Sequence, residues 1–181
     1  MHPRWLWVLF LLVPSIGFGQ SSALHPATDS EIVQAVAHEK NSVVLVDFWA
    51  TWCGPCREEL PKLVKLERDL HDQGLRLIIV SMDEPKQAKA AVQFLDSIGA
   101  RLPQYIRAQH TTDSAWVATI DPTWDGGLPG LFLYGRSGER LMRFRGERVD
   151  MEQIKRVISK VLQLPPAPVL TQDSAHAHGS R

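Results

Sequence analysis

A nearly continuous apolar run, SVVLVDFWA at residues 42–50, leads directly into the pattern Cys-Gly-Pro-Cys at residues 53–56. The run is rich in β-branched and aromatic residues, which predicts a strand buried on both faces, as at the centre of a sheet. The segment after it, residues 55–70, has the apolar spacing of a helix, with Gly74 as its stop. A buried strand that turns at once into a helix is typical of a layered α/β fold.

The rest of the chain predicts helices and strands in alternation. Thr28 and Glu31 have the spacing of a capping box, and Asp83 is expected to cap a helix that ends at Gly99. Pro61 should kink the helix after the cysteines. The other expected elements are a buried strand at 75–82, a weak strand at 102–109, a weak helix at 111–120, a hairpin turning at 135–138 and an amphipathic helix at 150–164. This order predicts an α/β sandwich with a mixed sheet.

Residues 1–19 have the layout of a secretory signal peptide. A charged start is followed by the apolar run Trp5–Val13 and then by small residues, which suit cleavage before Gln20. A retained membrane anchor is the alternative, but a spanning helix needs about 20 apolar residues, and this run is shorter. In either case we expect the folded part to be exported, to the periplasm or outside, where disulfides persist.

The other end of the chain, residues 165–181, is rich in proline and small polar residues and is expected to be a disordered tail. Its pair His176 and His178 lacks further ligands nearby, so we predict no metal site there. The prediction is therefore one compact domain at 20–164. Lysine and arginine together number 20, as do aspartate and glutamate. This balance argues against nucleic acid as a partner.

The chain's two cysteines, Cys53 and Cys56, allow a structural disulfide, half of a metal site or a redox couple. A zinc site usually needs four ligands, and no second cysteine pair exists. A disulfide across two residues closes a loop too short to stabilise much. Their position between a buried strand and a helix favours the redox couple. No cofactor is needed for that chemistry.

The helix predicts different roles for the two thiols. Cys53 lies at the helix N-terminus, where unpaired N–H groups and the helix dipole lower a thiol pKa, so it is expected to be the nucleophile. Cys56, in the first turn, would resolve the mixed disulfide, and Pro55 would stiffen the turn. Trp52 is expected to cover the site or to pack on a neighbouring loop. Burial should raise the pKa of Asp47, which could then exchange a proton with Cys56.

The stretch VDFWATWCGPC resembles the active-site segment of thioredoxins. With the secretory start, FWATWCGPCREELP is similar to the TlpA/ResA-like branch of exported thiol-disulfide oxidoreductases, and the resemblance covers roughly residues 40–160. It implies a thioredoxin fold, with a central mixed β-sheet flanked by helices and a helical insertion after the second central strand. In GLPGLFLYGRSGERLMRFRGE, it identifies Pro129 as a cis-proline facing the disulfide. Leu128 would offer backbone groups to a substrate, beside Gly54 and Pro55.

The same resemblance implies a reductase of disulfides in extracytoplasmic proteins, with apocytochrome c among the targets and a membrane thiol carrier as electron donor. Two departures bear on substrate preference: Gly130 stands where many relatives have Thr or Ser, and no lysine on the strand at 75–82 can pair with Asp47. The alternatives are a dithiol oxidase or isomerase and a thiol-based copper chaperone. A peroxidase is disfavoured, because Ala50 stands where a threonine is usual.

Overall fold

The computed structural model describes residues 23–101, 103–108, 113–144 and 150–163. The predicted signal peptide, its cleavage point, the tail and the two tail histidines lie outside these residues. Within the described part of the chain, no helix is both long enough and apolar enough to cross a membrane.

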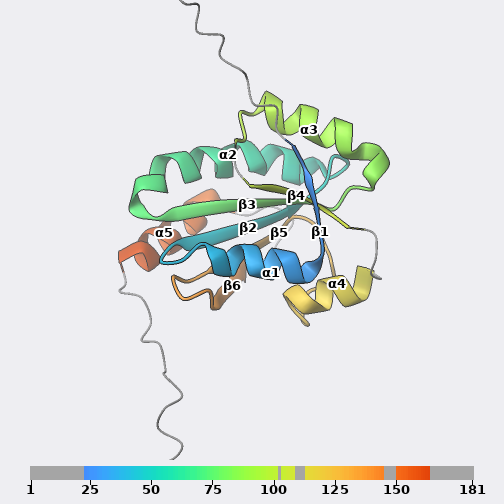
Figure 1. The fold of residues 1–181 in the computed structure, drawn as a ribbon. Coiled ribbons are helices and arrows are strands. Elements are labelled where there is room, and N and C mark those ends of the chain that lie inside the picture. Colours follow the sequence, from blue (N-terminus) through green and yellow to red (C-terminus); the bar gives the residue numbers. More distant parts are fainter. Residues whose placement is uncertain (1–22, 102, 109–112, 145–149, 164–181) are drawn as a thin grey trace, which may run out of the picture.

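The centre of the fold is a six-stranded mixed sheet with the order β1-β4-β3-β2-β5-β6. Strands β1, β4, β3 and β2 are parallel neighbours, whereas β5 runs antiparallel to β2, and β6 antiparallel to β5. Figure 1 shows β4, β3, β2 and β5, the strands between the two edges of the sheet, side by side. The strands are β1 (His25–Ala27), β2 (Val43–Trp49), β3 (Leu75–Ser81), β4 (Gln104–Arg107), β5 (Gly130–Tyr134) and β6 (Arg140–Phe144).

Helices cover both faces of the sheet, with α2 and α3 on one side and α1 and α4 on the other (Figure 1). The α-helices are α1 (Asp29–His38), α2 (Gly54–Leu70), α3 (Ala88–Ser97), α4 (Asp113–Ile120) and α5 (Met151–Gln163), and the short 3-10 helices are η1 (His71–Gln73) and η2 (Pro85–Gln87). The predicted capping box at Thr28 and Glu31 is present at the start of α1. The predicted sandwich and its helical insertion between β3 and β5 are therefore confirmed.

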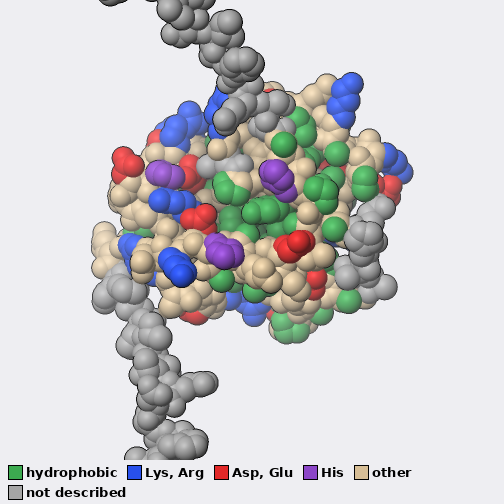
Figure 2. All heavy atoms as spheres, in the orientation of Figure 1, with side chains coloured by type: hydrophobic (Ala, Val, Ile, Leu, Met, Phe, Trp, Pro, Cys, Tyr) green, Lys and Arg blue, Asp and Glu red, His purple; other side chains and the backbone are tan. Residues whose placement is uncertain are grey.

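Alternation along β2 explains why the sheet has two separate cores. Val43, Leu45 and Trp49 pack against α2, α3 and α5, whereas Val44, Val46 and Phe48 pack against α1 and α4. Strand β2 is buried along its whole length, as its apolar run predicts. The surface mixes charges of both signs around the hydrophobic side chains at the middle of the face shown in Figure 2, which agrees with the balanced composition.

One strand was not predicted, and one predicted helix cap is wrong. Strand β1 was not expected, because three residues that include Pro26 carry no periodic pattern; it forms by pairing with β4 alone. Asp83 caps no helix: the N-cap of η2 is Glu84 and that of α3 is Gln87. The Asp83 carboxylate accepts hydrogen bonds from the loop before Cys53 instead.

Candidate active site

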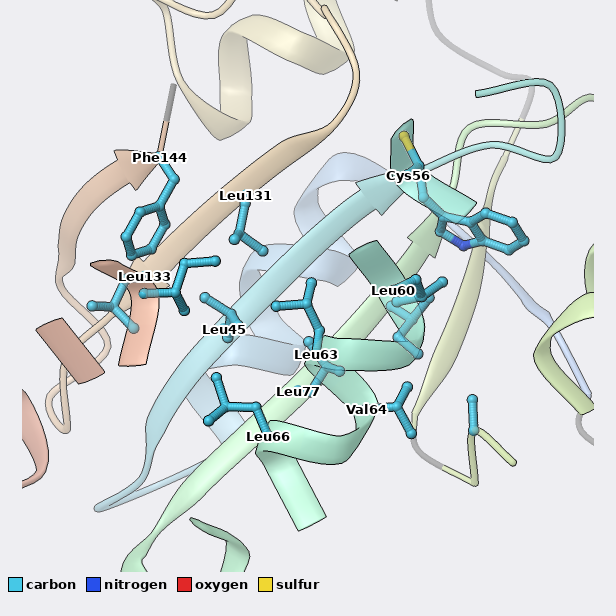
Figure 3. Packing of buried hydrophobic residues seen from close by; sticks show 14 of the residues in the cluster. Leu45, Cys56, Leu60, Leu63, Val64, Leu66, Leu77, Leu131, Leu133 and Phe144 are labelled. Atoms are coloured by element: carbon cyan, nitrogen blue, oxygen red, sulfur yellow. The ribbon is translucent and has the colours of Figure 1, made fainter. Parts of the chain in front are cut away.

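The two cysteines lie where β2 ends and α2 begins, joined in a disulfide with their Cα atoms 5.3 Å apart. Cys53 is the N-cap of α2, and its Sγ accepts a hydrogen bond of 3.3 Å from the backbone N–H of Cys56. Cys53 is 6% exposed and Cys56 only 1%. Figure 3 shows Cys56 at one end of the packed leucines that join α2 to the sheet. Cys53, at the helix start, is therefore the more exposed residue of the pair.

The residues between the cysteines leave the surface beside the disulfide open. Gly54 and Pro55 are both exposed, and a Cβ atom at Gly54 would meet no other atom within 4 Å. Pro55 occupies the first turn of α2, where its missing N–H costs no helical hydrogen bond. A partner molecule could therefore approach the disulfide from this side.

The peptide bond between Leu128 and Pro129 is cis, as the resemblance implied. It lies just before β5, whose first residue, Gly130, pairs with Phe48 of β2. This pairing places the cis-proline loop next to the end of the strand that leads to Cys53. Pro129 is buried and Leu128 is half-buried.

Trp124 explains the glycine that follows the cis-proline. A Cβ atom at Gly130 would lie 2.6 Å from the indole of Trp124, so the ring occupies the space that a Thr or Ser side chain would need. The indole N–H of Trp124 donates to the carbonyl of Gly127 at 3.0 Å, and the ring packs against Phe48 and Phe132. Gly130 is thus a consequence of packing beneath the cis-proline loop.

A groove of about 410 Å³ opens between the residue before Cys53 and the residue before the cis-proline. Trp52, whose side chain is 65% exposed, and Leu128 both line it. The other lining residues are Met82, Arg107, Ser114, Val117, Asp125 and Gly126. The end of β4 and helix α4, both in the insertion between β3 and β5, therefore contribute one wall. The structure therefore brings together the aromatic residue before Cys53 and the residue before the cis-proline.

Asp47 is buried at 2% exposure, between Ile79 of β3 and Leu131 of β5. Its Oδ2 has no hydrogen-bond partner within the part of the chain that the structure describes. Burial is the main cause that raises the pKa of Asp47 well above its ordinary value, and the negative charge of Glu59 raises that pKa further. The predicted burial of Asp47 and the predicted direction of its pKa are both confirmed.

Glu59, which the sequence analysis did not single out, is a second buried acid at 6% exposure. It lies on α2 three residues after Cys56 and one before Leu60, on the side of the helix that faces the sheet. The spacing from Cys56 was the available signal, because residues three apart share a helix face. Asp47 thus has, in place of a positive partner on β3, a second buried carboxyl group whose charge acts on it.

Comparison with known proteins gives matches over most of the described chain. The sequence profile of the AhpC/TSA family matches residues 22–139. The chain is 31% identical over 96 residues to the thiol-disulfide oxidoreductase ResA of Geobacillus kaustophilus, covering 53% of this chain and 50% of the relative. It is 28% identical over 123 residues to ResA of Bacillus thuringiensis, covering 67% and 65%. The match thus spans about half to two thirds of these curated relatives.

Solved structures give the same picture. A structure described as a thiol:disulfide interchange protein DsbE of Chlorobium tepidum is 27% identical, with a TM-score of 0.57 over 70% of this chain and 84% of that one. A thiol-disulfide isomerase of Corynebacterium glutamicum, 17% identical, has a TM-score of 0.61 over 73% of this chain and 86% of that one. The second likeness concerns the fold alone.

Proposed function

We propose that this chain, which belongs to the AhpC/TSA family and has a thioredoxin-like fold, is a thiol-disulfide oxidoreductase. Its substrates would be disulfides in extracytoplasmic proteins. One observation carries the proposal: the Cys53–Cys56 disulfide lies at the N-terminus of α2, beside an open surface and next to the loop with the cis bond before Pro129. A disulfide that closes so short a loop stabilises a protein little. A purely structural disulfide would also not need an exposed surface beside it.

In the reduced protein, Cys53 is the attacking thiolate. Its Sγ lies at the helix start, where the N–H of Cys56 points at it and the helix dipole favours negative charge. It attacks one sulfur of the target disulfide, forms a mixed disulfide and releases the other target sulfur as a thiolate. The greater exposure of Cys53 supports this order over the reverse.

Cys56 completes the transfer from its buried position. It loses its proton and attacks Sγ of Cys53, which breaks the mixed disulfide and releases the second target thiolate. Two electrons have then passed from the dithiol of Cys53 and Cys56 to the target. Asp47, whose pKa is raised by burial and by the charge of Glu59, would accept this proton and later return it.

The cis-proline loop and the groove beside it are the proposed substrate-binding surface. Leu128 would present its backbone groups to an extended target segment, as the family resemblance implies. Trp52 lines the groove and is largely exposed, which supports contact with a partner more than packing on a neighbouring loop. Gly54 and Pro55 leave space for the target chain above the disulfide.

The compartment and partners are part of the same proposal. A signal peptide at residues 1–19, cleaved before Gln20 or retained as an anchor, would place the domain in the periplasm or outside the cell. A membrane thiol carrier would then re-reduce the Cys53–Cys56 bridge, and apocytochrome c would be one target. N-terminal sequencing of the mature protein tests the cleavage, and trapping with Cys56→Ser identifies targets as mixed disulfides with Cys53.

Insulin reduction with a small dithiol as donor tests the activity. The wild-type chain should accelerate precipitation of the insulin B chain, and Cys53→Ser should reduce the rate to that of the donor alone. Cys56→Ser should instead accumulate a mixed disulfide with insulin. A wild-type rate equal to the donor alone contradicts the proposal, and hydrogen peroxide offered in place of insulin tests the peroxidase alternative.

The direction of electron flow has its own test, because a dithiol oxidase or isomerase would use the same residues. Reduction potentials across such proteins run from about −270 to about −120 mV. Equilibration of Cys53 and Cys56 with glutathione measures where this pair lies. A potential near the reducing end supports the reductase, whereas one near the oxidising end assigns the oxidase.

A further inference from the structure

The loop before Cys53 is tied to the end of the neighbouring strand by one buried carboxylate. Asp83, two residues beyond β3, is 1% exposed. Its Oδ1 accepts from the Thr51 hydroxyl at 2.6 Å, and its two oxygens share the Thr51 backbone N–H at 3.1 and 3.0 Å. Its Oδ2 also accepts from the hydroxyl of Ser81 at 2.8 Å. One carboxylate thus joins β3 to a residue two positions before the nucleophile.

The hydrogen bonds from Thr51 to Asp83 satisfy a backbone N–H group that the neighbouring strand and helix leave without a partner. Thr51 lies after β2 and before α2, so its N–H has no partner in either element. The backbone hydrogen bonds on either side of Thr51 do not use its N–H group. The N–H of Cys53 donates to the carbonyl of Ala50, and the N–H of Met82 donates to the carbonyl of Trp49. Among the hydrogen bonds of the described residues, those from Thr51 to Asp83 hold the middle of the segment between Trp49 and Cys53.

We propose that Thr51 and Asp83 are positioning residues, which hold the segment that carries Trp52 and Cys53 so that the sulfur of Cys53 stays aligned with the start of α2. The inference rests on the proposed function, because alignment of that sulfur matters only if Cys53 reacts. Within the described residues, the hydrogen bonds between Thr51 and Asp83 do not involve the cysteine sulfurs, so the effect is transmitted through the backbone between Thr51 and Cys53.

The cost of burying Asp83 supports a role beyond filling space. A buried carboxylate is retained at a substantial desolvation penalty unless donors surround it. Within the described residues, the hydrogen bonds to the Asp83 carboxylate come from hydroxyl and N–H groups. A neutral side chain could fill the same volume. What the carboxylate adds is two acceptor oxygens that restrain the N–H and hydroxyl of Thr51 together, and charged hydrogen bonds are the stronger kind.

Looser positioning should slow the reaction of Cys53 even when the protein remains folded. Its Sγ would spend less time opposite the N–H of Cys56, which is 3.3 Å away in the structure, so its thiolate would be less stabilised. Misplacement of a reacting group by about 1 Å can cost about 100-fold in rate. Removal of only the Thr51 hydroxyl leaves the backbone bonds in place, and a loss of about three- to tenfold is expected.

Three substitutions at Thr51 in the full chain test the proposal. Thr51→Val and Thr51→Ala remove the hydroxyl, while Thr51→Ser keeps it. The readouts are the rate constant for alkylation of Cys53 by iodoacetamide at pH 7 in the reduced protein, kcat and KM for insulin reduction, and the thermal midpoint. Thr51→Val and Thr51→Ala should slow alkylation and lower kcat by about three- to tenfold, whereas Thr51→Ser should keep both near the wild-type values.

A purely structural role gives a different result. If Thr51→Val and Thr51→Ala lower the thermal midpoint but leave the alkylation rate of the folded protein equal to that of wild type, the positioning proposal is wrong. A Thr51→Ser variant that is alkylated as slowly as Thr51→Val contradicts the proposal as well. Alkylation needs no substrate, so it tests Thr51 even if insulin reduction fails in the wild type, which would contradict the proposed function alone.

Discussion

Two aspartates are buried close to the same disulfide, and their surroundings differ completely. Asp47, at 2% exposure in the middle of β2, has an Oδ2 without a hydrogen-bond partner among the described residues, and the charge of Glu59 acts on it. Asp83, at 1% exposure beyond β3, has both oxygens engaged by hydroxyl and N–H donors of Thr51 and Ser81. Equal burial therefore does not give equal chemistry.

The donors around each carboxylate decide what it can do. A carboxylate whose two oxygens accept several hydrogen bonds is fixed in position and acts as an acceptor. A carboxylate that lacks such donors favours the neutral acid, because burial penalises the charge. Asp47 is therefore suited to carry a proton for Cys56, whereas Asp83 is suited to hold the backbone. The same substitution at the two positions should have opposite consequences.

The largest expected effect is on turnover. Asp47→Asn keeps the size of the side chain but removes the group that exchanges a proton with Cys56. General acid–base catalysis contributes about 10²- to 10⁴-fold in typical enzymes, so we expect insulin reduction to slow on the order of 100-fold. The control is alkylation of Cys53, which should change much less. Equal losses in both measurements would place Asp47 in the first thiol's activation and not in the resolving step.

The next effect is on stability at the other aspartate. Asp83→Asn leaves one acceptor oxygen where two now bind Thr51 and Ser81, and it removes the charge that strengthens those bonds. We expect the free energy of unfolding at pH 7 to fall by about 2 kcal/mol. Urea denaturation of wild type and variant at that pH measures the difference. An unchanged or raised stability would show that the donors around Asp83 do not compensate its burial.

The same change at Asp47 should raise stability by a smaller amount. The pKa of Asp47 in the folded state lies above its ordinary value of 3.8, so the folded state holds the proton more tightly than the unfolded state. Its contribution is full below pH 3.8 and is lost as the pH rises from there through the folded-state pKa. Asp47→Asn removes that loss and should stabilise the protein by about 1 kcal/mol at pH 7, with an unpaired amide offsetting part of the gain.

Urea denaturation between pH 4 and 8 measures this third prediction. The wild-type stability should decline toward high pH relative to Asp47→Asn, and the two curves should converge toward pH 4. A constant offset between the curves at every pH would mean that packing, and not the proton on Asp47, causes the difference.

The contrast between the two aspartates also explains what the sequence could reveal. The apolar neighbours of Asp47 within one strand predicted its burial, since a strand of that composition lies at a sheet centre. Asp83 depends on a partner 32 residues away, and its place after a strand suggested a helix cap. Only the parallel register, which pairs Trp49 with Ser81, puts Thr51 and Asp83 at the same level, two residues beyond each strand. Local patterns carry no such register.

Glu59 and Trp124 escaped prediction for related reasons. An acidic residue in an amphipathic helix is usually assigned to the solvent face. Glu59 lies on the buried face because it is three residues after the buried Cys56. The glycine after the cis-proline was visible as a departure from the family, but its cause is a ring six residues earlier that folds back over it. Both depend on which side chains meet in three dimensions.

The smallest effect we predict separates the two causes that raise the pKa of Asp47. Glu59→Gln removes the negative charge but leaves the burial, which is the larger cause. The pKa of Asp47 should therefore fall relative to wild type and still lie above 3.8. NMR titration of a labelled Asp47 carboxyl measures the shift, with Glu58→Gln, an exposed neighbour on α2, as the matched control.

The outcome of that titration shows how much burial and the charge of Glu59 each contribute to the raised pKa of Asp47. If Glu58→Gln moves the titration of Asp47 as much as Glu59→Gln does, the effect is general to the charge of α2 and not to the buried pair. If Glu59→Gln returns the pKa of Asp47 to its ordinary value, burial contributes less than the structure indicates. A small downward shift with Glu59→Gln alone would mean that desolvation keeps the proton on Asp47, and that Glu59 sets how readily it is given up to the sulfur of Cys56.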